Sequence, residues 1–173
     1  MANVDNPHGL APLNRTLSGG APAVMPFVKD ASATVVYIND VIQRDADGGV
    51  SAGISTPLVG VSLHWSAAST AAELLVMCDP HAVYEAQDNA DSDGFALVDM
   101  GANCNIEANS GSTTTYISGH ELDESTAATT NTCHVHLIRL FPVVSGNAYG
   151  NHARIEVNFS AAALGSAVAG ITT

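Results

Sequence analysis

The sequence predicts an all-β protein, built as a single antiparallel β-barrel or a jelly-roll-like sandwich with an extended N-terminal arm. Apolar residues alternate with small or polar residues over 58–65 and again over 154–159. Successive side chains of a strand point to opposite faces of its sheet, so this period of two is typical of half-buried strands. We expect these side chains to face the interior: Val59, Val61, Leu63, Trp65, Ile155, Val157 and Phe159.

Short apolar segments recur about every ten residues with turn-forming residues between them, which is the spacing of an antiparallel barrel or sandwich. The chain has 173 residues, which corresponds to about one domain. Residues 1–24 are the expected arm, because their Pro and Gly clusters carry no apolar period. Residues 25–160 are the expected β-barrel body, and residues 161–173 form a C-terminal tail of small residues.

Each predicted strand is a short run of apolar and β-branched residues bounded by turn signals. Residues 74–77 are apolar on both faces, which favours a buried strand there. Residues 45–49 predict a turn, and the Ser, Thr and Ala run 125–132 predicts an ordered loop or a strand edge. The expected strands are 24–28, 34–38, 58–65, 74–77, 82–86, 95–100, 103–107, 114–118, 132–140 and 154–159.

The charge balance excludes several classes of partner. Seventeen acidic residues stand against five basic ones, for a formal net charge of −12. Nucleic-acid binding needs a basic surface to neutralise phosphates, so no nucleic-acid partner is expected. The same deficit argues against an anionic membrane surface, and no run of about 18 strongly apolar residues predicts a membrane span. An acidic surface instead suits solubility or a partner with basic patches.

The cysteines predict free thiols. Cys78, Cys104 and Cys133 are odd in number and have no CxxC spacing, so they form no disulfide framework. Free buried thiols are typical of a reducing cytosol. The chain also shows no N-terminal apolar stretch of the kind that a secretory signal contains.

The strongest metal candidate is the pair His134 and His136, which would share one face of a strand. Two imidazoles so placed can chelate Zn, Fe or Mn, as the HxH of cupin-type barrels does. A third ligand would come from His64, His120 or His152. However, no carboxylate follows on the same segment, so the alternative is two histidines on the wetter face of a strand. We therefore expect no metal and no cofactor.

Two further patterns favour ordinary turns over chemistry. The segment 89–94 resembles the opening of a calcium loop, but Asn89 stands first and Met100 stands twelfth, where an EF-hand needs Asp and Glu. A solvated turn is the favoured interpretation, with a weak cation site as the alternative. No G-x-S-x-G nucleophile elbow is present. The sequence thus predicts no catalytic residues and a protein that is not an enzyme.

Several blocks, taken in order, resemble the capsid decoration, or cement, proteins that stabilise the heads of tailed bacteriophages. The resemblance spans nearly the whole chain and rests on the order and spacing of the blocks. The blocks are MANVDNPHGLAP at 1–12, TVVYINDVI at 34–42, PLVGVSLHW at 57–65, LLVMCDPHAVYEAQ at 74–87, SGHELDESTAATTNTCHVHLIRL at 118–140 and GNHARIEVNFS at 150–160.

The resemblance implies a β-barrel or jelly-roll-like body, an N-terminal arm and no catalysis. It also implies a homo-oligomer, dimer or trimer, made in the host cytoplasm and bound to the major capsid protein on the outer surface of the virion head. We expect the arm and exposed strand edges to be the contact surfaces. Deleting residues 2–20 should then leave a folded body that binds empty capsids more weakly.

Two alternatives remain from the residues themselves. One is a cupin-like metal-binding barrel that uses His134 and His136. The other is a glycan-binding or host-attachment head fibre. Sugar sites usually need exposed aromatic rings, and this chain has only four Phe, one Trp and four Tyr, which argues against the second alternative.

Overall fold

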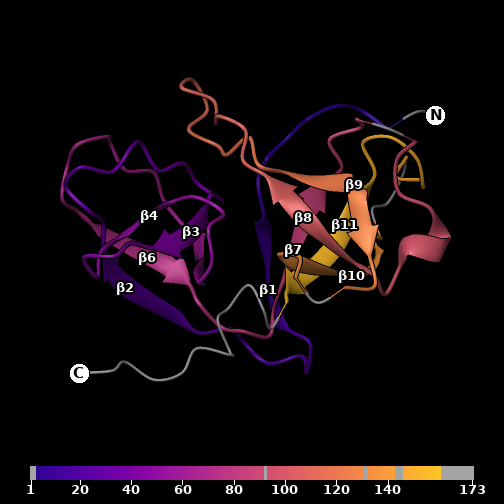
Figure 1. The fold of residues 1–173 in the computed structure, drawn as a ribbon, viewed down its shortest axis with the longest axis horizontal. Helices are drawn as coiled ribbons and strands as arrows, with labels where there is room; N and C mark the ends of the chain where they lie inside the picture. The colour runs from indigo at the N-terminus through magenta and orange to yellow at the C-terminus, as the bar shows by residue number, and fades with distance from the viewer. Residues whose placement is uncertain (1–2, 92, 131, 143–145, 161–173) are drawn as a thin grey trace.

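The computed structural model describes residues 3–91, 93–130, 132–142 and 146–160. These residues form two antiparallel sheets that pack as a sandwich, and they contain one short 3₁₀ helix and no α-helix (Figure 1). The elements are β1 (Ala11–Thr16), β2 (Val24–Val28), β3 (Val41–Arg44), β4 (Val50–Ala52), β5 (Leu58–Ser62), β6 (Glu73–Met77), β7 (Ala82–Gln87), η1 (Leu97–Asp99), β8 (Asn103–Glu107), β9 (Glu121–Ala128), β10 (Val135–Leu140) and β11 (Arg154–Phe159).

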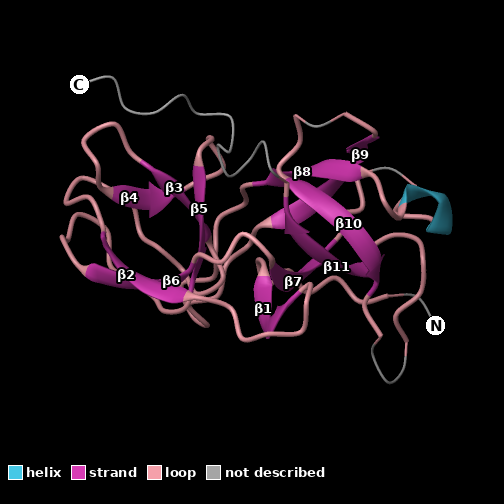
Figure 2. Cartoon of the chain, turned by 90° about the horizontal axis from the view of Figure 1, so that it is seen from below, coloured by secondary structure: helices cyan, strands magenta, loops and turns pink. Residues whose placement is uncertain are grey.

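The larger sheet has six strands in the order β1-β7-β11-β10-β8-β9. Its centre is the antiparallel pair β7 and β11, in which Ala86 lies opposite Ile155 and Tyr84 lies opposite Val157. Every residue of β7 is buried. The smaller sheet has five strands in the order β2-β6-β5-β3-β4 and lies at the other end of the molecule from η1 (Figure 2).

The main core joins the two sheets. Tyr84 and Phe159 of the larger sheet pack at a ring separation of 5.3 Å, and the Tyr84 hydroxyl donates to the Met77 carbonyl of the smaller sheet at 3.1 Å. Val61 of β5 lies in the same cluster. A second cluster lies within the smaller sheet and consists of Val36, Ile42, Val50, Leu74 and Val76. Burial of such aliphatic side chains supplies roughly 1.5–3 kcal/mol each.

The all-β prediction is confirmed, and of its two forms the jelly-roll-like sandwich fits the structure. The closed barrel is wrong, because the strands divide between two sheets and neither sheet forms a full ladder between its first and last strands. In the described chain, a single bridge from Lys29 to Val50 links the edges of the smaller sheet, and a single bridge from Asp88 to Leu122 joins the end of β7, not β1, to β9. The acidic loops and short edge strands give too few paired residues to close either sheet.

Several predicted strands are confirmed, three of them to the residue: 24–28, 103–107 and 154–159. The expected strands 34–38, 95–100 and 114–118 are wrong, since each makes only isolated bridges. In 95–100 the Asp99 carboxylate accepts the Ala96 N–H at 2.7 Å, which favours the tight 3₁₀ turn η1.

The turn over 45–49 is confirmed, and 125–128 lies in β9 at the edge of the larger sheet, as expected. The prediction missed β1, β3, β4 and most of β9. β1 contains Pro12 and an Asn14 with φ of +54°, and β9 is rich in charged residues. These residues are depleted from strands, so tertiary pairing rather than local propensity forms these strands.

The interior assignment is confirmed for β11, where Ile155, Val157 and Phe159 are at most 3% exposed. It is wrong for Trp65, which is 41% exposed and packs on Tyr116 at a ring separation of 4.9 Å. The reason is that β5 ends at Ser62, so the period of two does not extend to residue 65.

The segment expected as an arm is partly a strand of the body. Residues 11–16 pair with β7, which places β1 at the edge of the six-stranded sheet, and Leu10 is fully buried in the main core. The chain is ordered here because it pairs with the edge of β7 and because Leu10 packs into the main core. The boundary at residue 24 therefore does not separate an arm from the body, and the tail 161–173 lies outside the described residues.

Candidate functional site

His136 lies on β10 and His134 directly before it, and the Nδ1 atom of each ring is engaged by a neighbour. His134 Nδ1 accepts the backbone N–H of Ile106 at 3.0 Å. A neutral imidazole that accepts at Nδ1 carries its proton on Nε2, so His134 presents no second lone pair. His136 Nδ1 lies 3.1 Å from Asn103 Oδ1. Burial lowers the pKa of His134, which keeps this ring neutral.

The structure does not bring the expected third ligands to this pair. His120 Nδ1 accepts the Val41 N–H at 3.3 Å within the core, and His64 Nδ1 accepts the Leu75 N–H at 3.4 Å on the smaller sheet. In the described residues, the one group of three His, Cys, Asp or Glu with ligand atoms within 4.8 Å of one another is Asp5, Glu121 and His152. Of these three residues, only His152 is among the candidate metal ligands that the sequence predicted.

The segment 89–94 makes the contacts of a turn. Asn89 Oδ1 accepts the N–H of Asp91 at 3.3 Å, and Asn89 Nδ2 donates to Glu107 at 2.7 Å. Strand β7 precedes the segment, and Phe95 forms a bridge with Gly150 after it. The flanks are thus extended rather than helical, unlike those of an EF-hand.

A serine, a histidine and an aspartate meet near the core, but in the wrong order for acyl transfer. Ser118 bonds to Asp40, and His120 Nε2 lies 3.7 Å from Asp40. A nucleophilic triad needs the imidazole between the serine and the carboxylate. Here the carboxylate lies between them, and burial lowers the pKa of His120 to about 4. The three side chains therefore form a buried polar cluster and do not have the arrangement of a catalytic triad.

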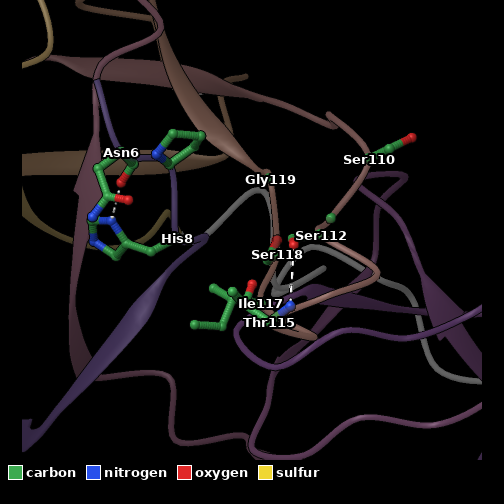
Figure 3. A pocket seen from close by; sticks show the side chains of 10 residues that line it. Asn6, His8, Ser110, Ser112, Thr115, Ile117, Ser118 and Gly119 are labelled. Carbon is green, nitrogen blue, oxygen red and sulfur yellow. Dashed lines mark hydrogen bonds between the residues drawn. The ribbon is translucent and has the colours of Figure 1, made fainter. Parts of the chain in front are cut away.

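A cleft of about 270 Å³ opens between the N-terminal segment and the loop before β9. Figure 3 shows Asn6 and His8 on one wall, facing Ser112, Ser118 and Gly119 on the other. The Ser112 and Ser118 hydroxyls accept backbone N–H groups of their own loop. His8 is the one titratable side chain that lines the cleft, and its Nε2 bonds to Glu85 at 2.9 Å. The cleft is thus lined by groups already used in folding.

The outward face of the larger sheet holds two buried carboxylates opposite each other, Glu85 on β7 and Glu156 on β11. They are 4% and 2% exposed. Arg154 and His8 bond to Glu85. Burial opposes ionisation of Glu85 most strongly, but these bonds outweigh it and hold its pKa below the usual value.

Glu156 is paired with two further arginines. Arg139 bonds to both of its oxygens, at 2.9 and 3.0 Å, and Arg15 reaches it from β1. Here too burial is the largest influence and the arginine bonds outweigh it, so the pKa of Glu156 is lowered. The chain has only five Lys and Arg residues, and three of them are paired with the two carboxylates of this face. The remaining surface is therefore strongly acidic.

Two groups of exposed apolar side chains lie at opposite ends of the molecule. The β2 patch consists of Val24, Val28 and Leu75, which are 43%, 70% and 44% exposed. The η1 patch consists of Leu97 and Val98, which are 70% and 87% exposed. Figures 1 and 2 both place β2 at one end of the long axis and η1 toward the other. Exposed apolar clusters of this kind are typical of contact surfaces.

Comparison with known proteins gives no relative: no family model, no curated protein and no solved structure matches the chain. Its fold and surfaces therefore carry the functional argument. The described part of the chain contains no helix with the length and apolarity that a membrane crossing requires.

Proposed function

We propose that this protein is a structural component of a virion, which binds the outside of a tailed-phage head and stabilises the lattice of the major capsid protein. The observation that carries the proposal is the pair of apolar patches at opposite ends of the molecule. A protein that holds neighbouring capsomers together needs at least two contact surfaces. The block order that resembles phage decoration proteins supports the same function.

The β2 patch is suited to a protein partner. Val24 and Val28 alternate along β2, and Leu75 lies opposite Pro26 on the neighbouring strand, so these side chains share one face. β2 is also an edge strand, whose outer backbone groups suit strand addition by a partner. A contact of modest affinity suffices, because many copies on one lattice act together.

The charge distribution supports the same partner. Twelve of the seventeen acidic residues are half-buried or exposed, whereas Lys29 is buried and donates to the carbonyls of Ala67 and Thr70. Such a surface keeps free subunits soluble and attracts basic patches on a shell. The proposal includes self-association as a homodimer or homotrimer, and it includes no nucleic-acid or membrane partner.

The test is binding of the purified protein to capsids that lack it, measured by co-sedimentation for the wild type and for Val28→Lys. The lysine lies opposite Glu73 across the β2–β6 pair, where opposite charges are tolerated. We expect the apparent affinity to fall at least tenfold, because the apolar contact is interrupted and a charge must be desolvated.

The matched control is Leu17→Lys, which places the same charge at an apolar side chain 51% exposed and outside both patches. This variant should bind like the wild type. If Val28→Lys saturates capsids at the wild-type concentration, the β2 patch is not the contact surface.

A further inference from the structure

We propose that Asp5, Glu121 and His152 bind a divalent transition-metal ion, Zn²⁺ or Mn²⁺, where the N-terminal segment meets the body. One ligand atom from each residue lies within 4.8 Å of the other two. The three come from separate parts of the chain: the segment before β1, the first residue of β9, and the loop before β11. The inference does not depend on the proposed capsid function.

The distances suit an ion between the side chains. His152 Nδ1 and Asp5 Oδ1 are 3.9 Å apart, which is too long for a hydrogen bond. Zinc bonds to nitrogen and oxygen are about 2.0–2.2 Å long, so two ligands of one tetrahedral ion lie about 3.4 Å apart. The His152–Asp5 pair would need to close by about 0.5 Å, and Glu121 by at most about 1.4 Å, both within reach of side-chain rotation.

Asp5 is held in position by its neighbours. The Gln87 side chain, 1% exposed, accepts the Asn6 N–H at 2.8 Å and donates to the Val4 carbonyl at 2.7 Å. The same amide group donates to the His152 carbonyl at 3.1 Å. One buried side chain thus fixes the backbone on both sides of Asp5 and also fixes His152. Asn109 orients Glu121 through a bond of 3.2 Å.

Two buried polar atoms at the proposed site, one of them a ligand atom, lack a hydrogen-bond partner within the described residues. His152 Nδ1 is closed to solvent and makes no hydrogen bond within the described residues. Asp88 is fully buried, and its Oδ2 accepts the His152 N–H at 3.0 Å, while its Oδ1 has no hydrogen-bond partner there. Buried polar atoms are nearly always satisfied. An ion bound by His152 would satisfy the first atom and would offset the negative charge of the second.

The ligand types select the ion. One imidazole with two carboxylates suits Zn²⁺ or Mn²⁺, whereas Ca²⁺ and Mg²⁺ prefer oxygen ligands throughout. Three protein ligands leave the remaining coordination positions to water. Since Asp5 belongs to the N-terminal segment and Glu121 to the β9 edge, the ion would tie the start of the chain to the far edge of the larger sheet.

The test is isothermal titration of the full chain, stripped of metal and kept reduced, with ZnCl₂ and separately with MnCl₂. We expect one equivalent to bind and to raise the unfolding temperature. Asp5→Asn and Glu121→Gln should each weaken binding at least tenfold. Asp5 is 65% exposed, so its variant reports on binding even if Glu121→Gln is poorly folded.

The matched controls are Asp47→Asn and His81→Gln, which alter exposed residues of the same types away from the site. Both should bind like the wild type. The proposal is overturned if neither ion binds the wild type, or if one equivalent binds equally well to Asp5→Asn and Glu121→Gln. Loss of binding in His136→Gln alone would also overturn it, by placing the ion on β10.

Discussion

The outward face of the larger sheet and the uncovered apolar part of the smaller sheet are built in opposite ways. On the larger sheet, Glu85, Gln87 and Glu156 point away from the core yet are at most 4% exposed, because the N-terminal segment and three arginines cover them. On the smaller sheet, Val28 and Leu75 share a face with Met77 of the main core, but they are not covered by that core and are 70% and 44% exposed. The first face is polar but closed by its own chain, while the second is apolar and left open.

This difference teaches which face is available to a partner. A buried carboxylate with two arginine partners stabilises a fold only while its partners stay in place. An uncovered apolar face does not depend on such partners and gains free energy when another surface covers it. The larger sheet therefore closes its polar face with its own chain, and we propose that the smaller sheet presents the contact surface.

The largest expected effect comes from removing the cover of the larger sheet. Deletion of residues 2–20 removes β1, the buried Leu10 and the partners of Glu85 and Gln87. Contrary to the expectation from sequence, the remaining chain should lose cooperative unfolding and become poorly soluble. Circular dichroism and a urea titration check this. A truncated chain with a wild-type unfolding midpoint would show that the cover is dispensable.

A smaller effect is expected from a single pair within that face. Glu156→Gln keeps the side-chain volume but leaves Arg139 and Arg15 without their carboxylate. Breaking a fully buried pair costs about 3–5 kcal/mol, and because both arginines are partly exposed we expect about 2 kcal/mol at pH 7. The control Glu73→Gln, an exposed glutamate on β6, should change stability by less than about 0.5 kcal/mol.

The pH dependence of the Glu156→Gln variant tests whether the ionised Glu156 carboxylate stabilises the fold. The pKa of Glu156 is lower in the folded chain than its usual value. Its contribution is therefore present above the unfolded pKa and disappears as the pH falls through the folded pKa. The stability difference between wild type and Glu156→Gln should shrink in acid. A difference that stays constant to pH 3 would mean that the ion pairs do not stabilise the fold.

The smallest effect on stability is expected on the other sheet. Val28→Lys, the variant that should weaken capsid binding, should change the free energy of unfolding by less than about 1 kcal/mol, because Val28 is 70% exposed. Urea denaturation measures this directly. A loss of several kcal/mol would mean that the β2 patch helps to hold the chain together and is not reserved for a partner.

Local patterns predicted much of the fold. The period of two gave β11 and its buried Ile155, Val157 and Phe159 correctly. The same rule places Glu156 in solvent, and that is wrong, because its partner Arg15 lies 141 residues away in the chain. Local patterns contain no information on burial by residues that are distant in the chain. For the same reason, the sequence predicted an arm where the structure has β1.

The candidate metal site was beyond reach of the sequence for the same reason. His134 and His136 formed a recognisable spacing, but a backbone N–H of β8 uses the Nδ1 lone pair of His134. Asp5, Glu121 and His152 show no spacing motif, since only the packing of three distant segments brings them together.

The central claim, that this chain is a structural part of a phage head, is tested most directly by its copy number in purified virions. Quantitative mass spectrometry should find it at a level comparable to that of the major capsid protein, and mild denaturant should release it before the shell opens. Its absence from virions that are otherwise complete would contradict the account.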